Sequence, residues 1–380
     1  MKILHVITGL GLGGAETVLV RLASATAHRH EVTVVSLTGD SYYAEPLRAM
    51  GIEVVVLGMP SGRLTRSGVL LLWETLRHKK PDLVQTWMYH ADLLGGVLAK
   101  FAVNAPIVWG IRNSNLDAGK VSRSTRLVVK LCALLSHFVP DKIVCCSRAA
   151  CELHQRKGYS KGKFEFIPNG YDLAQYAPAT PESVQTIRDE LGITSDTFAM
   201  GMVARYDAQK DHETLLKALR ELKEDFPGFS CLLIGAGLTS ENGALRHLVA
   251  ELELQGNIKL LGIRNDVSRI VSALDLHILS SAYGEAFPNA VAEAMACGVP
   301  NVVTDVGDAK YIVGNEGWLV PTRDPIALAE GIRSAMLENK GEHVAYQNRK
   351  QRCREKMVNA YSMDKMLAAF QHLWTVLSSK

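Results

Sequence analysis

The sequence has few cysteines, and they show no pattern typical of a metal site or a disulfide framework. There are seven, an odd number, with no Cys-x-x-Cys pair and no histidine at a zinc-binding spacing. We therefore expect reduced thiols, as in a cytosolic protein.

The sequence also lacks a long hydrophobic run. No stretch approaches the roughly 20 consecutive apolar residues that a membrane-spanning helix needs. The start, MKILHVITGLGLGG, is interrupted by glycines where a signal peptide would be continuously apolar, so we expect a first strand there. These absences predict a protein on the cytoplasmic side that does not cross the membrane.

Length and composition indicate a two-domain soluble protein. A chain of 380 residues exceeds the size at which a single core stops growing, and 47% hydrophobic with 21% charged residues is typical of globular domains. The net charge of +3 is uneven, because residues 1–175 hold 21 of the 42 basic but only 13 of the 39 acidic side chains. The basic half is either suited to an anionic membrane or phosphate-bearing substrate, or simply carries solvated charge.

Short β-branched runs alternate with helical patterns along the chain, which predicts parallel α/β architecture. The expected strands of the first series are 2–7, 31–37, 53–57, 82–86, 106–110 and 141–146, and those of the second are 198–203, 230–234, 257–261, 274–279 and 300–304. The segment IPNGYDLAQYAPATPE at 167–182 is rich in turn residues and predicts the boundary. We expect domains at 1–172 and 173–361, with ligands at the carboxyl ends of the strands.

The segment at 280–308, SSAYGEAFPNAVAEAMACGVPNVVTDVGD, places Glu285 and Glu293 on either side of an expected helix start. Pro288 suits a first helical turn, and the following residues to Cys297 favour helix. Amide groups at a helix start attract phosphate, and nearby carboxylates can accept hydrogen bonds from sugar hydroxyls. Two glutamates flanking a helix can equally be ordinary surface charges.

This E-x7-E segment closely resembles the carboxyl-terminal motif of retaining GT-B glycosyltransferases of family 4. MVARYDAQKDHETLLKAL at 202–219 resembles the family's Arg-x4-Lys loop, FIPNGYD its interdomain segment, and GLGLGGAE its first glycine loop. The resemblance covers nearly the whole chain. It implies an α/β GT-B fold: two Rossmann-like domains facing each other across a cleft, with a C-terminal helix, about 362–380, crossing back to the N-terminal domain.

The resemblance also implies roles for individual residues. Arg205 and Lys210 would neutralise the diphosphate leaving group, Glu285 would touch the transferred sugar, and Glu293 would bind the ribose. Backbone near the phosphates would come from Ala286, Phe287, Pro288, Asn289 and Ala290, with Gly13, Gly14, Gly235 and Gly237 also on the donor side. DVGD at 305–308 resembles the loop that meets the donor sugar, but Asp308 replaces the usual glycine and Tyr311 the usual glutamate.

The glycines at 9, 11 and 14 also fit G-x-G-x-x-G, which raises an NAD-dependent interpretation. The acidic residue expected about 20 positions later is missing, since Val34 stands at that distance. Dinucleotide binding is therefore disfavoured.

Three residues after expected strands are candidates for the acceptor side: His90, Arg112 and Asn113. Many family members carry a histidine at the position that Arg112 or Asn113 occupies, and an arginine there could bind a phosphate or carboxylate. His90 can equally be a structural histidine at a helix start.

The segment at 121–140 places Arg123, Arg126 and Lys130 among leucines and valines with helical period. Such a helix could lie on an anionic membrane or pack on the sheet with its basic side chains at the rim, and we favour packing.

We therefore predict a retaining glycosyltransferase that moves a sugar from a UDP- or GDP-sugar to a glycan or lipid-linked acceptor of surface glycans. The nucleotide sugar is a substrate, and we expect no cofactor, no nucleic-acid partner and no metal, since the sequence has no Asp-x-Asp pair beside the expected diphosphate site. The alternatives are a nucleotide-sugar 2-epimerase, an NAD-dependent oxidoreductase and a non-catalytic sugar-binding protein.

Overall fold

The computed structural model describes residues 1–114, 116 and 122–379, and its contacts divide them into two compact units. The N-terminal unit comprises Met1–Gly170 together with Asp364–Lys380, and the C-terminal unit comprises Tyr171–Met363. Each is a parallel sheet with helices on both faces, so the predicted fold class of two Rossmann-like α/β domains is confirmed.

The N-terminal unit has a seven-stranded sheet of order β3-β2-β1-β4-β5-β6-β7, in which every pairing is parallel. The strands are β1 (Lys2–Ile7), β2 (Glu31–Ser36), β3 (Glu53–Val56), β4 (Leu83–Trp87), β5 (Ile107–Ile111), β6 (Lys142–Cys145) and β7 (Phe164–Phe166). The helices are α1 (Gly14–Thr26), α2 (Ala44–Ala49), α3 (Arg66–Lys79), α4 (Tyr89–Ala102), α5 (Arg123–Leu135), α6 (Arg148–Arg156), the 3-10 turn η1 (Lys161–Lys163) and α15 (Met363–Ser378).

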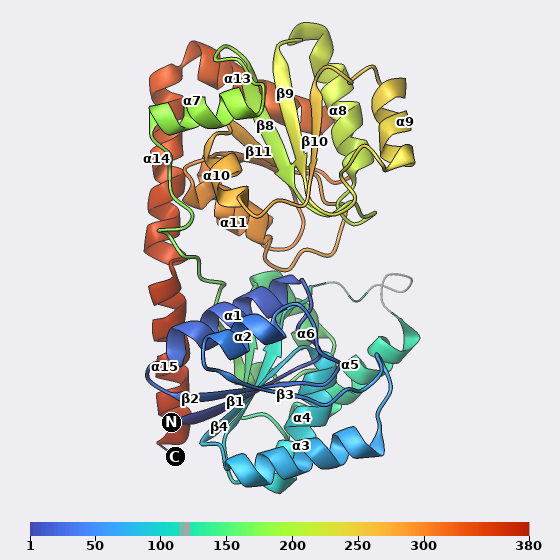
Figure 1. Ribbon diagram of the computed structural model, residues 1–380, viewed down its shortest axis with the longest axis vertical. Helices are drawn as coiled ribbons and strands as arrows, with labels where there is room; N and C mark the ends of the chain where they lie inside the picture. The colour runs from blue at the N-terminus through green and yellow to red at the C-terminus, as the bar shows by residue number, and fades with distance from the viewer. Residues whose placement is uncertain (115, 117–121, 380) are drawn as a thin grey trace. The chain divides into compact units, whose positions relative to one another are not determined.

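Helices α1 and α2 lie on one face of this sheet and α3 and α4 on the other (Figure 1). Alternation along β1 explains the two layers, since Leu4 and Val6 pack into the core beneath α3, α4 and α5. His5 points to the opposite face, where its ring contacts Trp374 of α15. Trp374 also donates a hydrogen bond of 2.8 Å to Gln85 of β4, so α15 is part of the N-terminal unit.

The C-terminal unit has a six-stranded parallel sheet of order β10-β9-β8-β11-β12-β13. The strands are β8 (Phe198–Val203), β9 (Phe229–Ile234), β10 (Ile258–Gly262), β11 (Leu276–Leu279), β12 (Asn301–Thr304) and β13 (Trp318–Val320). The helices are α7 (Pro181–Glu190), α8 (His212–Asp225), α9 (Gly243–Glu251), α10 (Val267–Ser272), α11 (Asn289–Ala296), α12 (Ala309–Val313), the 3-10 turn η2 (Gly314–Glu316), α13 (Pro325–Gly341) and α14 (His343–Ala360).

Each sheet has one edge strand that the sequence pattern did not predict. These strands, β7 and β13, are three residues long, which is too short for β alternation to be recognised. The helix expected over 288–297 begins one residue later than predicted, because Pro288 is the N-cap in an extended conformation. The site-bearing elements are otherwise placed as predicted.

Candidate active site

The loop after β8 carries the two cations of the predicted site. Arg205 is 60% exposed and pairs with Asp207, Nε to Oδ2 at 3.3 Å. Asp211 ends the loop in the left-handed conformation, φ 50°, which Asp tolerates better than most residues. Its carboxylate accepts hydrogen bonds from the amide and hydroxyl of Thr214 and so caps α8. This cap therefore fixes the end of the loop directly after Lys210.

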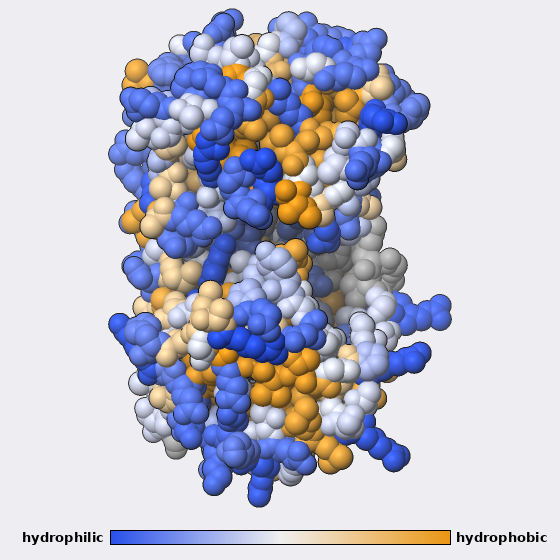
Figure 2. Space-filling model, viewed as in Figure 1, coloured by the Kyte–Doolittle hydropathy of each residue, from blue (hydrophilic) through white to orange (hydrophobic). Residues whose placement is uncertain are grey.

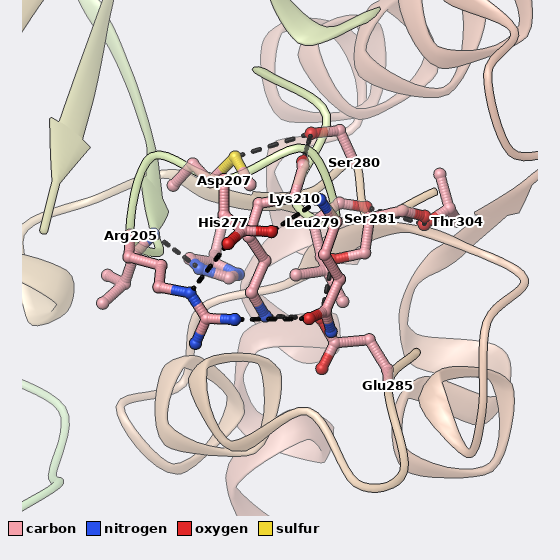
Figure 3. Close-up of polar contacts among 12 residues, drawn as sticks. Arg205, Asp207, Lys210, His277, Leu279, Ser280, Ser281, Glu285 and Thr304 are labelled. Carbon is pink, nitrogen blue, oxygen red and sulfur yellow. Dashed lines mark hydrogen bonds and ion pairs between the residues drawn. The ribbon is translucent and has the colours of Figure 1, made fainter. Parts of the chain in front are cut away.

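Lys210 and Glu285 form an ion pair that joins the loop after β8 to the loop after β11 (Figure 3). The Lys210 Nζ lies 2.5 Å from the Glu285 Oε1, and the two side chains are 17% and 9% exposed. The Ser281 hydroxyl donates to the same carboxylate oxygen at 2.7 Å. Such a desolvated pair has a strong Coulomb attraction, but each charge is costly to bury without the other.

Backbone contacts hold the two loops against each other. Ala282 donates its amide hydrogen to the Gln209 carbonyl at 2.8 Å, and the Ser280 hydroxyl donates to the Lys210 carbonyl at 2.8 Å. Thr304 at the end of β12 donates its hydroxyl to the Ser281 carbonyl at 2.7 Å. The geometry of the Lys210–Glu285 pair therefore depends on three neighbouring strands.

Glycine is required at one position beside Glu285. Gly307 has a φ of 60°, and a Cβ there would lie 2.0 Å from the Glu285 carbonyl oxygen. The amide of Asp308, the residue that replaces the family's usual glycine, donates to the Ala286 carbonyl at 3.0 Å. The loop at 305–308 thus packs directly on the loop that carries Glu285.

Two buried histidines support the cationic loop from behind. His277 of β11 accepts a hydrogen bond from the Val203 amide through Nε2 at 3.4 Å, while its Nδ1 lies 2.6 Å from the Asn301 Oδ1. Burial lowers the pKa of His277 to about 4, and burial followed by the charge of Lys210 lowers the pKa of His212 to about 4. Both rings are neutral at physiological pH, so they add no positive charge next to Lys210.

Helix α11 begins directly after the loop that carries Glu285. Its N-cap, Pro288, provides no side-chain acceptor for the amides of the first turn. The side chain of Asn289, the first residue of the helix, accepts a hydrogen bond of 2.5 Å from the Tyr171 hydroxyl. Phe287 stacks on Tyr171 and packs against Tyr361. These aromatic contacts fix the start of the helix. Ala286 is buried beside them.

Further along the helix, Glu293 is partly exposed in the second turn of α11, four residues before the buried Cys297. Ala290, also partly exposed, lies one turn before Glu293. Ala290 and Glu293 therefore lie on the same face of α11, because residues three or four apart on a helix do so.

Gly235 and Gly237 lie in the loop after β9, beside the loop after β8. Gly235 has a φ of 145°, and a Cβ there would lie 2.0 Å from the Ala204 carbonyl oxygen. Gly237 has a φ of 78°, and a Cβ would lie 3.0 Å from that of Tyr206. Both glycines are required by close packing against the residues on either side of Arg205, which explains them without a ligand.

In the N-terminal unit, α1 begins at Gly14 with Gly13 as its N-cap. Glu16 in the first turn folds back, so that a Cβ on Gly13 would lie 2.3 Å from its carboxylate oxygen. Burial raises the pKa of Glu16. A carboxylate therefore already occupies the helix start that the sequence suggested for phosphate, a competition that the glycine pattern alone did not indicate.

The candidate acceptor residues gather at the carboxyl ends of β4 and β5. Met88 precedes α4 with φ 71° and ψ 157°, a conformation that favours glycine and often marks functional sites. His90 follows in the first turn of α4, and burial lowers its pKa. The Arg112 guanidinium lies over the Trp87 ring at 4.6 Å and donates to the Asn169 Oδ1 at 2.7 Å.

Among the described residues, the Nε and Nη2 atoms of Arg112 are buried without a hydrogen-bond partner. A buried guanidinium with unused donors is suited to an anionic ligand. Asn113 follows directly in the chain and is partly exposed.

Sequence reasoning missed three residues that shape these sites: Ser281, His277 and Met88. Ser281 and His277 lie on or beside a buried strand, where a serine or histidine carries no distinctive pattern. Met88 could have been suspected only from its backbone conformation, which the residue type does not reveal.

Within the C-terminal unit, a lysine, an arginine and a helix start thus meet at the carboxyl ends of parallel strands. This arrangement can bind a diphosphate and stabilise negative charge on a departing phosphate oxygen. The two Rossmann-like units have the fold of GT-B glycosyltransferases. A model of "Glycosyltransferase Family 4" matches residues 12–175 and one of "Glycosyl transferases group 1" matches residues 183–352, together most of the chain. The chain belongs to glycosyltransferase family 4, group 1.

Characterised relatives resemble the chain over most of its length. It is 25% identical over 312 residues to the Escherichia coli UDP-Gal:alpha-D-GlcNAc-diphosphoundecaprenol alpha-1,3-galactosyltransferase, covering 80% of this chain and 78% of that protein. It is 24% identical over 353 residues to a Campylobacter jejuni N-acetylgalactosamine-N,N'-diacetylbacillosaminyl-diphospho-undecaprenol 4-alpha-N-acetylgalactosaminyltransferase, covering 90% and 92%. Among solved structures, Anabaena HepE in complex with UDP and glucose matches all of both chains with a TM-score of 0.84 and 23% identity.

No helix among the described residues is long and apolar enough to cross a bilayer. Helix α5 packs against α4, and its Val129, Cys132 and Ala133 are part of the core of the N-terminal unit. Residue 121 of the predicted segment lies outside the described residues. The opposite side of the helix carries the exposed Leu127, Leu131 and Leu134.

Proposed function

We propose that this glycosyltransferase is a retaining, metal-independent enzyme that moves a sugar from a UDP-sugar to a hydroxyl of a lipid-linked glycan acceptor. The observation that carries the proposal is the nearly buried Lys210–Glu285 pair, with Arg205 on the same loop and the start of α11 on the adjoining one. An ammonium held in place before the donor arrives needs little reorganisation as charge develops on the leaving phosphate.

In the proposed reaction, Lys210 and Arg205 bind the diphosphate, and the amides at the start of α11 donate to it. Glu285 then accepts a hydrogen bond from a hydroxyl of the transferred sugar, and the partly exposed Glu293 accepts from the ribose. These interactions strengthen as the bond between sugar and phosphate breaks, which is the condition for lowering the barrier. The cations of this site replace the metal ion that other transferases use.

The choice of UDP rests on the relatives. The Escherichia coli relative is named for a UDP-galactose donor, and HepE was solved with UDP. Both relatives named above act on diphosphoundecaprenol-linked acceptors. In this chain the unused donors of Arg112 would bind such an acceptor's diphosphate, and His90 and Asn113 would line the acceptor side.

A lipid-linked acceptor requires contact with a membrane, and we propose that α5 makes it. Leu127, Leu131 and Leu134 form a stripe along this helix and are 58%, 40% and 63% exposed. Exposed Arg123 and Lys130 lie on the same side of the helix. A leucine stripe bordered by cations matches the interface of an anionic bilayer.

Transfer to a defined acceptor tests the enzyme assignment. Thermal-shift screening of UDP-, GDP- and ADP-sugars selects the donor, and the labelled donor is then incubated with N-acetylglucosaminyl-diphosphoundecaprenol. We expect label in the lipid fraction, an unchanged rate in EDTA, and a product whose anomeric configuration by NMR equals that of the donor. A sugar that is epimerised with donor alone, or a melting temperature raised by NADH but by no nucleotide sugar, would support the rival classes.

Liposome flotation tests the membrane contact. The variant Arg123→Glu/Arg126→Glu/Lys130→Glu should lose binding to vesicles containing anionic lipid. The control Arg220→Glu, on α8 of the C-terminal unit, should float like the wild type. Equal flotation of all three proteins would eliminate this role for α5.

A further inference from the structure

A large apolar groove crosses the N-terminal unit. Its volume is about 690 Å³, within the range of small-molecule sites. Its lining is mainly hydrocarbon, contributed above all by Met59, Leu93, Leu94, Val97, Leu98 and Val128. On the face shown in Figure 2, hydrophobic residues also gather at the surface of this unit.

Two glycines of α4, the helix that contributes most of the apolar lining, lie in close contact with the sheet. A Cβ on Gly96 would lie 2.3 Å from the indole nitrogen of Trp109, and one on Gly95 would lie 3.0 Å from Val6. Because these two residues lack a side chain, α4 packs closely against β1 and β5. Residues of α5 and of the segment after β3 complete the lining of the groove.

The lining of the groove includes polar side chains as well as exposed apolar ones. Thr8, Thr38 and His90 line the groove and lie at or just after the carboxyl ends of β1, β2 and β4. Ligands of open α/β sheets bind at these strand ends. Leu64, which is 71% exposed, lines the groove and also a second apolar hollow with Val69 and Leu70 of α3.

The groove thus includes both the candidate acceptor residue His90 and the exposed Leu64. Helix α5, which forms one wall through Val128 and Leu135, carries the proposed membrane-contacting leucines on its outer side. A contiguous exposed apolar surface is typical of an interaction site in a folded protein. Its position favours a lipid that extends from a membrane to the strand ends.

We propose that this groove binds the first isoprene units of a polyprenyl-diphosphate acceptor and directs the sugar-bearing end toward Thr8, Thr38 and His90. The proposal deepens the function proposed above and depends on it for the identity of the lipid, since the two relatives act on diphosphoundecaprenol-linked sugars. Burial lowers the pKa of His90, so the ring is neutral and compatible with an adjoining hydrocarbon. Arg63 also lines the groove.

Binding of a short polyprenyl diphosphate tests the proposal directly. Calorimetric titrations of the full chain, saturated with UDP to occupy the donor site, compare farnesyl diphosphate, dodecyl diphosphate and inorganic pyrophosphate. Burial of the hydrocarbon tail should make farnesyl diphosphate bind at least about tenfold more tightly than pyrophosphate. Equal affinities would overturn the proposal, and tighter binding of the straight-chain dodecyl compound would overturn its polyprenyl occupant in favour of an acyl chain.

Two groove variants locate the binding. Val97→Trp fills the groove and should remove the advantage of farnesyl diphosphate over pyrophosphate, whereas Val344→Trp, at a residue that is 74% exposed on α14, should keep it. Leu98→Gln, similar in size but polar, replaces Val97→Trp if that variant does not fold. An advantage that persists in a folded groove variant would refute the assignment of the site.

The groove proposal and the proposed enzyme activity can fail independently of each other in these experiments. Failure of UDP-sugar transfer to any lipid-linked acceptor contradicts the proposed function. Normal transfer, together with farnesyl diphosphate that binds no more tightly than pyrophosphate, contradicts only the groove proposal.

Discussion

Removal of the Lys210 ammonium tests both the energetics and the chemistry of the candidate site. In Lys210→Met the aliphatic stem is kept, but the Glu285 carboxylate, only 9% exposed, loses the cation 2.5 Å away. Breaking a buried ion pair from one side costs about 3–5 kcal/mol, because the remaining charge is desolvated without compensation. We expect a loss of this order in the free energy of unfolding, measured with urea.

A second substitution separates stability from catalysis. In Lys210→Met/Glu285→Gln the unpaired charge is removed, and the glutamine carbonyl can still accept the hydrogen bond from Ser281. The double variant should regain at least about 2 kcal/mol relative to Lys210→Met. Its transfer rate should stay reduced by on the order of 10²–10³, because no ammonium stabilises the leaving phosphate.

The matched control is an exposed pair in the same unit. Lys217 and Glu213 are joined at 2.6 Å on α8, but their side chains are 48% and 63% exposed. The corresponding change, Lys217→Met/Glu213→Gln, should alter stability by less than about 0.5 kcal/mol and leave transfer unchanged. A wild-type transfer rate in Lys210→Met, or a double variant that regains activity together with stability, would refute the role of Lys210.

The exposure of Glu293, the burial of three titratable side chains and the close packing at Gly235 can each be tested. Glu293→Ala should lose most transfer activity and nucleotide affinity while its melting temperature stays close to that of the wild type, since Glu293 is partly exposed. His212 and His277 have folded pKa values of about 4 against 6.5 in the unfolded chain. Unfolding should therefore become easier as the pH falls from 6.5 to 4, by up to roughly 3 kcal/mol for each ring, and His212→Leu should reduce this slope in urea titrations. Burial raises the pKa of Asp92 from 3.8 to about 8, so its contribution to stability is present below pH 4 and is lost as the pH rises to 8. Asp92→Asn should be more stable than the wild type at pH 8, by up to roughly 5 kcal/mol, with the difference vanishing near pH 4. Gly235→Ala should unfold at least about 3 kcal/mol more easily, because its methyl group would meet the Ala204 carbonyl at a φ of 145°, and an unchanged melting temperature would contradict this.

The order and type of the long elements were predictable from the chain alone. Strands such as β1 and β8 are continuous β-branched or apolar runs, and α8 has a helical period behind an Asp cap, so local patterns suffice. The short edge strands β7 and β13 were missed, since three residues carry no readable alternation. Arg205, Lys210 and Glu285 were found because their spacing resembles a family motif.

Three contacts that define the sites could not be derived in this way. The pairing of Lys210 with Glu285 and Ser281 depends on β8 and β11 being neighbours in the sheet, although 75 residues separate the two charged side chains. The carboxylate of Glu16 over Gly13 depends on a rotamer, and the close packing of α4 against the sheet depends on what Gly95 and Gly96 meet there. The sequence by itself determined which elements form and which charged residues stand at their ends, because these follow from local periodicity and capping. Only the tertiary structure decided which of those residues meet and where apolar surface is left uncovered, because both depend on packing between segments distant in the chain.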